Sequence, residues 1–289
     1  MSKVKKVLLT LIFLSIIGGL LYGAIYVNKA NGQSVQGIKN KIVSINNTNK
    51  PAVLVKEDAK IPVRELKKVK IKENKIELKK RSDLVVVIDP GHASSTSLEK
   101  EQRAPGSNVM KIKEPGGAQG INTKTPEYVV NMAVSLRLRS LLKEKGYTVI
   151  MTKTDNKQML GNVARAQIGN AAKADLVIRI HADANNDSSI IGASMLIPAD
   201  SKNTKAIYKT SKRYGQIVFR NLIESIGMNN RGVVERNDLT GFNWSKAPIM
   251  LVEMGFLSNV EEDKKLTTVI YQDKLAKALS EGIDKALME

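Results

Sequence analysis

From residue 83 to the end of the chain, short apolar runs alternate with longer segments of helical periodicity. The apolar runs predict buried strands at 84–88, 147–151, 176–180, 193–197 and 249–252. The other segments have apolar residues at every third or fourth position and predict helices at 126–145, 161–174, 204–227 and 271–288. Alternating strands and helices indicate an α/β domain over residues 83–289. We expect a mostly parallel, twisted sheet of about five to six strands, with helices on both faces.

The first predicted helix has clear boundary signals. Thr125 suits its N-cap, Pro126 its first helical position, and Gly146 the position just after its end. The helix over 204–227 contains Gly215, and glycine is unfavourable in a helix interior. This helix is therefore predicted with a weakened centre.

The amino-terminal segment has a different pattern. Residues 7–27 form a run of 21 residues without a charge, and a helix of that length spans about 30 Å, the thickness of the hydrocarbon core of a bilayer. We predict a retained transmembrane anchor, with Lys3, Lys5 and Lys6 keeping the N-terminus in the cytoplasm. The alternatives are a buried soluble helix and a cleaved signal peptide, whose apolar region is usually only about 7–15 residues long. With an anchor or a signal peptide, everything after Val27 lies outside the cytoplasm.

Residues 28–82 are strongly basic, with 15 Lys and Arg against 5 Asp and Glu, and they contain no aromatic residue. This composition predicts a solvated linker or stalk, with one or two strands as the alternative. The formal net charge of the whole chain is +18, which favours anionic partners such as lipid headgroups or wall polymers. Aromatic residues make up only 4% of the chain, which argues against a nucleic-acid partner. Because there is no cysteine, disulfides and Cys-ligated metals are excluded.

The chain has only two histidines, and each follows a predicted strand. His92 follows the run 84–88 in "DLVVVIDPGH", and His181 directly follows 176–180 in "DLVIRIH". In open α/β sheets, ligands bind beyond the carboxyl ends of the strands, so neighbouring strands would direct both imidazoles into one crevice. Imidazole is a suitable ligand for zinc, and the pair predicts a metal site. The alternative is two independent histidines, each hydrogen-bonded in a structural role.

A catalytic zinc needs three protein ligands and one open position, and without cysteine we expect the third ligand to be a carboxylate. Glu127 suits this role, because it lies in the first turn of a predicted helix, on the face that turns toward the core. Favourable interaction with the helix dipole is another reason for a glutamate at this position. Three glutamates of the predicted loop 94–125 are rivals for the role: Glu99, Glu101 and Glu114.

Glu253 follows the apolar run 249–252, the same strand-end position as the two histidines. A charged group in such surroundings is costly unless it is paired or coordinated. A zinc hydrolase needs a general base near the attacking water, and we predict this role for Glu253. The alternative is an edge-strand carboxylate that pairs with one of the many lysines or arginines.

Four segments, in order, resemble the zinc-dependent N-acetylmuramoyl-L-alanine amidases of bacterial cell-wall lysis: "IDPGH", "PEYVVNMAVSLRL", "ADLVIRIHADA" and "APIMLVEMGFLSN". The resemblance covers residues 83–289. It implies one zinc ion per chain, held by His92, Glu127 and His181. It also implies that Glu253 is the catalytic glutamate.

The chain departs from this family in one spacing. The first histidine and the metal-binding glutamate usually lie closer in sequence than His92 and Glu127. The longer intervening segment leaves Glu114 open as an alternative ligand.

The resemblance implies hydrolysis of the amide between the lactyl group of N-acetylmuramic acid and L-alanine in peptidoglycan. It implies that zinc polarises the carbonyl and activates water, while Glu253 takes the water proton and returns it to the leaving nitrogen. The expected partners are peptidoglycan and, through residues 7–27, the membrane, and the sequence leaves open whether a protein activates the enzyme. The alternatives are a zinc peptidase acting on the stem peptide and a non-catalytic wall-binding module on the same fold.

Overall fold

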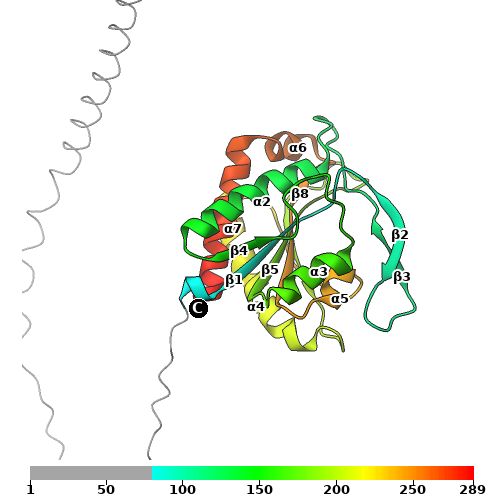
Figure 1. Cartoon of the computed structure of the whole chain (residues 1–289). Coiled ribbons are helices and arrows are strands. Elements are labelled where there is room, and N and C mark those ends of the chain that lie inside the picture. The colour runs from blue at the N-terminus through cyan, green and yellow to red at the C-terminus, as the bar shows by residue number, and fades with distance from the viewer. Residues whose placement is uncertain (1–79) are drawn as a thin grey trace, which may run out of the picture. The chain divides into compact units, whose positions relative to one another are not determined.

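The computed structural model of the chain describes residues 80–289, which are drawn in colour in Figure 1. The predicted anchor at 7–27 lies outside these residues, as does the predicted stalk at 28–82 except for its last three positions. Within residues 80–289, no helix is both long enough and apolar enough to cross a membrane. The anchor and the stalk therefore stay predictions.

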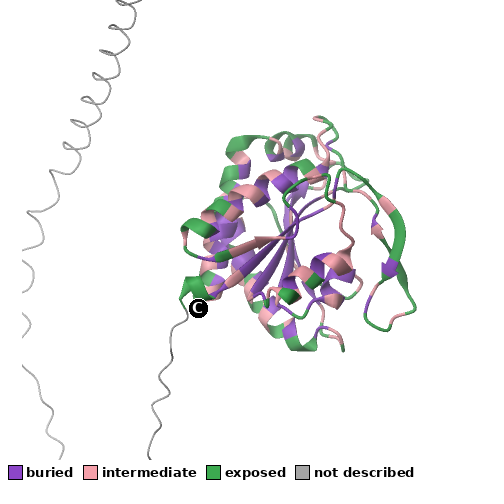
Figure 2. Cartoon of the chain, in the orientation of Figure 1, coloured by how far each residue is buried: buried purple, intermediate pink, exposed green. Residues whose placement is uncertain are grey.

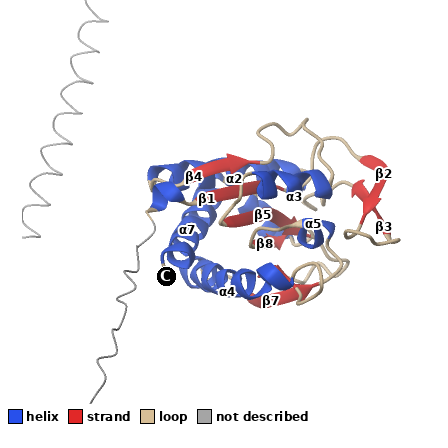
Figure 3. Cartoon of the chain, turned by 60° about the horizontal axis from the view of Figure 1, so that its bottom comes forward, coloured by secondary structure: helices blue, strands red, loops and turns tan. Residues whose placement is uncertain are grey.

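A twisted sheet forms the centre of the domain (Figure 1, Figure 3). It has six strands in the order β4-β1-β5-β8-β6-β7. Neighbouring strands are parallel except for β6 and β8, which are antiparallel. The predicted α/β sheet, mostly parallel, is confirmed, and it contains all five predicted strands. The six strands are β1 (Val85–Pro90), β4 (Thr148–Met151), β5 (Leu176–Asp183), β6 (Ala193–Pro198), β7 (Asn230–Arg236) and β8 (Ile249–Phe256).

Helices cover both faces of the sheet, as predicted. On one face α7 packs against both α2 and α4, and α3 and α5 lie on the other face (Figure 1). The helices are α2 (Glu127–Glu144), α3 (Asn162–Ala171), α4 (Lys205–Ile226), α5 (Thr240–Trp244), α6 (Val260–Leu266) and α7 (Val269–Met288), with a short 3-10 helix η1 at Arg81–Asp83.

Successive strand residues point to opposite faces and form two apolar cores. Val86 and Ile178 belong to the core beneath α2, α4 and α7, whereas Val87 and Val177 belong to the core on the other face. Figure 2 shows that the central strands are buried along most of their length. Because these strands are covered on both faces, their sequences are continuous apolar runs and do not alternate with polar residues.

The structure also contains elements that the sequence pattern did not predict. The predicted loop 94–125 contains an antiparallel hairpin of β2 (Ser97–Gln102) and β3 (Met110–Glu114), which forms a separate two-stranded sheet. The edge strand β7 was also missed, because it is partly exposed and lacks the apolar run of a buried strand. The short helices α5 and α6 were likewise not predicted.

The helix boundaries differ slightly from the prediction. α2 begins at Glu127, and the N-cap is Pro126, whose backbone is extended, rather than the preceding threonine. Gly146 follows the helix with a φ of 95°, a left-handed conformation that glycine adopts readily. α4 is continuous through Gly215, where a Cβ atom would lie 2.7 Å from Cγ2 of Ile197. Close packing of α4 on β6 therefore explains the glycine in the middle of the helix.

Candidate metal centre

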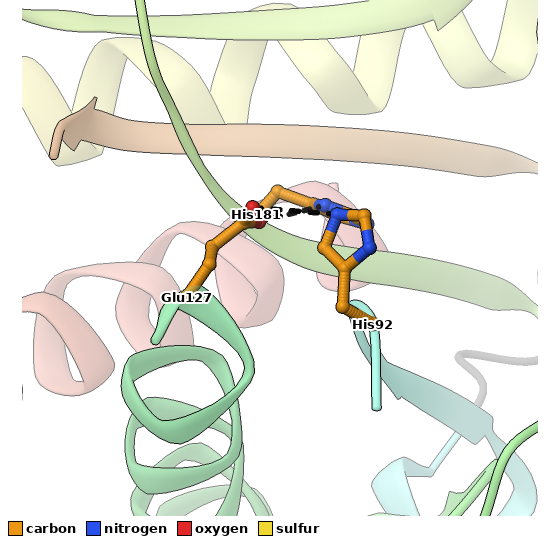
Figure 4. A group of neighbouring side chains, drawn as sticks. All are labelled: His92, Glu127 and His181. Carbon is orange, nitrogen blue, oxygen red and sulfur yellow. Dashed lines mark hydrogen bonds and ion pairs between the residues drawn. The ribbon is translucent and has the colours of Figure 1, made fainter. Parts of the chain in front are cut away.

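His92, Glu127 and His181 lie together at the carboxyl edge of the sheet (Figure 4). Each offers one ligand atom, and these atoms lie within 4.8 Å of one another. His92 Nε2 lies 3.3 Å from Glu127 Oε2, and His181 Nδ1 lies 3.1 Å from Glu127 Oε1. The structure thus brings the three predicted ligands to one point.

The sheet topology explains how the two histidines meet. β1 and β5 are parallel neighbours, so their carboxyl ends lie side by side. His181 belongs to β5, and His92 follows β1 after a turn in which Gly91 N donates to Ile180 O at 2.9 Å. His92 has a φ of 60°, a left-handed conformation that is uncommon for residues other than glycine. The turn after β1 therefore directs the first imidazole toward the second.

The Glu127 carboxylate is buried and held by hydrogen bonds from both sides. Ala118 N donates to Oε2 at 2.8 Å, and Asn131 Nδ2 donates to Oε1 at 2.9 Å. Burial opposes the charge, but the hydrogen bond with His181, the nearby histidine charges and Asn131 lower the pKa of Glu127 to about 2. Glu127 is therefore ionised at neutral pH.

His181 is buried in a form that suits metal binding. Burial lowers the pKa of His181 to about 4, so the ring is neutral at pH 7. Its Nε2 atom is buried and has no hydrogen-bond partner among the described residues. A Cβ atom on Gly91 would overlap the ring, so the glycine before His92 makes room for His181.

Glu253 lies beside this cluster on β8, where its register partner on β5 is His181. Burial, followed by the neighbouring carboxylates of Glu127 and Asp183, raises the pKa of Glu253 well above its ordinary value. Its Oε2 atom is buried and has no hydrogen-bond partner within residues 80–289. Because β8 lies between β5 and β6, Glu253 is not on an edge strand, and the alternative of an edge-strand carboxylate is wrong.

The three rival glutamates have other contacts. Glu99 is exposed and forms an ion pair of 2.7 Å with a lysine of the same hairpin. Glu101 is buried and accepts hydrogen bonds from the first two backbone N–H groups of α3. Glu114 Oε1 lies 2.8 Å from His92 Nδ1, the ring nitrogen opposite the one that faces the cluster. None of the three belongs to the group of potential ligands found in the described residues.

A buried ion network beneath the site was not predicted. Asp89 Oδ1 lies 2.7 Å from Arg165 Nη1, and Asp89 Oδ2 lies 2.8 Å from Arg179 Nε. All three side chains are buried. The sequence contained a signal, because Asp89 and Arg179 each interrupt an apolar strand, and a charge in such a place needs a partner.

Two clefts open beside the cluster. One has a volume of about 280 Å³ and extends toward β3 and α5, and the other, of about 320 Å³, lies along the segment before α2 and the end of β5. His92, His181 and Glu253 line both clefts. A ligand bound at the cluster could therefore extend to either side.

The residues present fit a zinc ion. Hydrolytic zinc sites use imidazole nitrogens and carboxylate oxygens as three protein ligands. Here two imidazoles and one carboxylate converge, and His181 has a buried ring nitrogen, Nε2, without a hydrogen-bond partner among the described residues. The backbone also passes close to the cluster, since a Cβ atom on Gly117 would lie 2.6 Å from Glu127 Oε2.

Comparison with known proteins places these residues in a sequence family. The family described as N-acetylmuramoyl-L-alanine amidase matches residues 86–285. LytC of Bacillus subtilis, named as an N-acetylmuramoyl-L-alanine amidase, is 26% identical over 197 residues, which cover 68% of this chain and 34% of that protein. The chain therefore matches about a third of the length of that relative.

Solved structures of amidases have the same fold. The apo form of the amidase Ami1 from Mycobacterium abscessus superposes with a TM-score of 0.65 and 25% identity, covering 71% of this chain and 98% of that one. The CwlD amidase from Clostridioides difficile, solved in complex with the GerS lipoprotein, gives a TM-score of 0.58 and 27% identity, covering 71% and 98%.

Proposed function

The chain belongs to the N-acetylmuramoyl-L-alanine amidase family, and from this membership we propose that it hydrolyses the amide between the lactyl group of N-acetylmuramic acid and L-alanine in peptidoglycan. The proposed reaction needs one zinc ion, bound by His92, Glu127 and His181. The observation that carries the proposal is the convergence of these side chains beside Glu253, a buried carboxylate with an unpartnered oxygen.

The proposed ligands are prepared for a cation by their surroundings. Glu127 is ionised and fixed by hydrogen bonds, so it offers a negative charge without reorganisation. His181 is kept neutral by burial and so has a lone pair available. When bound, zinc supplies Lewis-acid polarisation of the scissile carbonyl and increases the acidity of water.

We assign proton transfer to Glu253. It would take a proton from the attacking water and return it to the nitrogen of the leaving L-alanine. A general base works best when its pKa lies near the working pH, and burial raises the pKa of Glu253 in that direction. Its unpartnered Oε2 is free to accept the proton.

The position of the cluster between two clefts suits a substrate that extends in two directions. The scissile amide joins a glycan on one side to a stem peptide on the other. With this amide at His92 and His181, each cleft would receive one of the two parts.

Peptidoglycan lies outside the cytoplasm, and the predicted membrane anchor at 7–27 would place the domain there. The amino-terminal lysines would remain inside, and the basic residues of 28–82 would lie near anionic headgroups and wall polymers. We therefore propose a membrane-anchored enzyme that acts on the wall next to the membrane.

A soluble muramoyl peptide of defined structure tests which bond is cleaved. Incubation with the full-length chain and zinc should release a peptide with L-alanine at its amino terminus and leave a free lactyl carboxylate on the muramic acid. An amino terminus further along the stem peptide would indicate a zinc peptidase instead. Binding of the peptide without cleavage would indicate a non-catalytic wall-binding module.

A further inference from the structure

Glu114 connects the β2–β3 hairpin to the metal-site histidine. Glu114 is the last residue of β3, and the residue is only 3% exposed. Its Oε1 atom lies 2.8 Å from His92 Nδ1, while the other ring nitrogen of His92, Nε2, lies 3.3 Å from Glu127 Oε2. The imidazole is thus held between two carboxylates, one on the cluster side and one on the hairpin side.

The hairpin that carries Glu114 is fixed to the domain by several contacts. Glu101 accepts hydrogen bonds from the amino-terminal N–H groups of α3 at 2.8 and 3.1 Å. Asn162 Nδ2 donates to Lys113 O at 3.1 Å, and Trp244 Nε1 donates to Gln102 O at 2.9 Å. Contacts from both strands therefore fix the position of the hairpin relative to α3 and α5.

Arg165 links Glu114 to the backbone that carries His92. Its Nη1 donates to Asp89 Oδ1 at 2.7 Å and to Pro90 O at 2.8 Å. Its Nη2 donates to His92 O at 3.3 Å and lies 3.5 Å from Glu114 Oε2. One buried guanidinium therefore contacts the left-handed turn at His92 and the carboxylate that contacts the His92 ring.

We propose that Glu114, held by Arg165, is a positioning residue that orients the His92 ring for metal binding. A neutral imidazole carries one hydrogen, and the shorter carboxylate contact, 2.8 Å at Nδ1 against 3.3 Å at Nε2, favours Nδ1 as its donor. This tautomer leaves the lone pair on Nε2, the nitrogen that would bind a metal ion beside Glu127. The proposal rests on the proposed function, because it assumes that the cluster binds zinc.

The two histidines differ in this respect. His181 contacts Glu127 through Nδ1, and its Nε2 has no hydrogen-bond partner among the described residues. His92, by contrast, contacts a second carboxylate, that of Glu114, through its other ring nitrogen. The long segment between His92 and Glu127, which departs from the usual family spacing, supplies this carboxylate. The hairpin thereby contributes to the metal site without providing a ligand.

Zinc affinity of the full-length chain, measured by competition with a chelator, tests the proposal. Loss of such an outer partner typically weakens metal binding by about 10–100-fold, and we expect this for Glu114→Ala. Glu114→Gln keeps an oxygen acceptor of the same size, so it should lose less than about tenfold. The matched control is Glu99→Gln on the same hairpin, whose carboxylate pairs with Lys113 and should leave zinc affinity unchanged.

A second measurement uses the metal-free chain. Nitrogen-15 NMR of the histidine side chains, recorded at a pH at which the His92 ring is neutral, should show His92 in the Nδ1–H tautomer in the parent and in Glu99→Gln, and a mixture of tautomers in Glu114→Ala. Circular dichroism checks that each variant is folded, and Glu114→Gln provides the folded test case if the alanine variant is not. Parental zinc affinity and an unchanged His92 tautomer in a folded Glu114→Ala chain would overturn the proposal. The tautomer result does not depend on amidase activity. If the parent chain is inactive but its His92 is in the Nδ1–H tautomer, that outcome would count against the proposed function alone.

Discussion

His181 and Glu253 are register partners on the neighbouring parallel strands β5 and β8. The pairing places a buried imidazole and a buried carboxylate side by side at the carboxyl edge of the sheet. Each has one buried atom without a hydrogen-bond partner in the described part of the chain, Nε2 of His181 and Oε2 of Glu253. Leaving such groups unpaired is costly for folding, which is typical of a site kept for a ligand or a reaction.

The first prediction concerns the metal. His92→Ala or His181→Ala removes one of the three converging side chains that we propose as zinc ligands, so each variant should lose stoichiometric zinc and activity. Metal content per chain, measured by elemental analysis after gel filtration, checks this. A variant that keeps one zinc per chain would show that the histidine is not a ligand.

The second prediction concerns Glu253. Glu253→Gln keeps the size of the side chain but cannot take a proton, so hydrolysis should fall by at least about 10²-fold while zinc binding stays parental. Turnover of the muramoyl peptide and metal content are measured on the same preparation. The control is Glu235→Gln on β7, which removes an exposed ion pair with Lys212 of α4 and should keep its activity.

The competing explanation makes a different prediction for the same variant. If Glu253 had only a structural role, Glu253→Gln would change the melting temperature and leave turnover near that of the parent. That result would move the general base to another carboxylate.

The strand-end pattern was enough to predict which side chains meet. Parallel neighbours present their carboxyl ends on the same edge of a sheet, so His92, His181 and Glu253 could be placed together from the apolar runs before them. Glu127 could be placed by its position at the start of a helix with a buried face. Each of these signals lies within a short stretch of sequence, and the sheet topology then brings the side chains together.

The contribution of the hairpin could not be predicted in the same way. β2 and β3 are largely exposed, and their sequences "SLEKEQ" and "MKIKE" contain no apolar run. The proposed role of Glu114 depends on a contact with His92, 22 residues away, and the buried ion network depends on the contact of Arg165 with Asp89, 76 residues away. Such contacts follow from the tertiary structure, and single-sequence periodicity does not contain them.

The third prediction concerns the stability of the buried ion network. Burial opposes the charge of Asp89, but Arg165 and Arg179 hold its pKa below the ordinary value of 3.8. Asp89→Asn leaves two buried guanidinium groups without their shared partner, and the free energy of unfolding at pH 7 should fall by about 3–5 kcal/mol. Urea denaturation measures this change.

The stabilisation that Asp89 provides should depend on pH. A carboxyl group whose pKa is lowered by folding stabilises the fold above its unfolded pKa, and this stabilisation is lost as the pH falls below 3.8 toward the folded value. The difference between the parent and Asp89→Asn should therefore shrink below pH 3.8. A difference that stays constant from pH 7 to pH 3 would contradict an ionised Asp89 in the folded chain.

The fourth prediction concerns placement. Residues 7–27 are expected to remain as an anchor, so a full-length chain should be found in the membrane fraction of the expressing cell. Replacing two central leucines of this run, Leu20 and Leu21, by lysine should release the chain from that fraction. Amino-terminal sequencing of a secreted form that begins shortly after residue 27 would show cleavage instead.

Digestion of purified sacculi tests the central claim, a zinc-dependent amidase, most directly. The full-length chain is incubated with sacculi as purified, after treatment with a chelator, and after zinc is added back, and the products are analysed by mass spectrometry. We predict intact stem peptides with free L-alanine amino termini and glycan strands with free lactyl groups. These products should disappear with the chelator and return with zinc. Unchanged release after complete removal of the metal, or cleavage within the stem peptide alone, would contradict the claim.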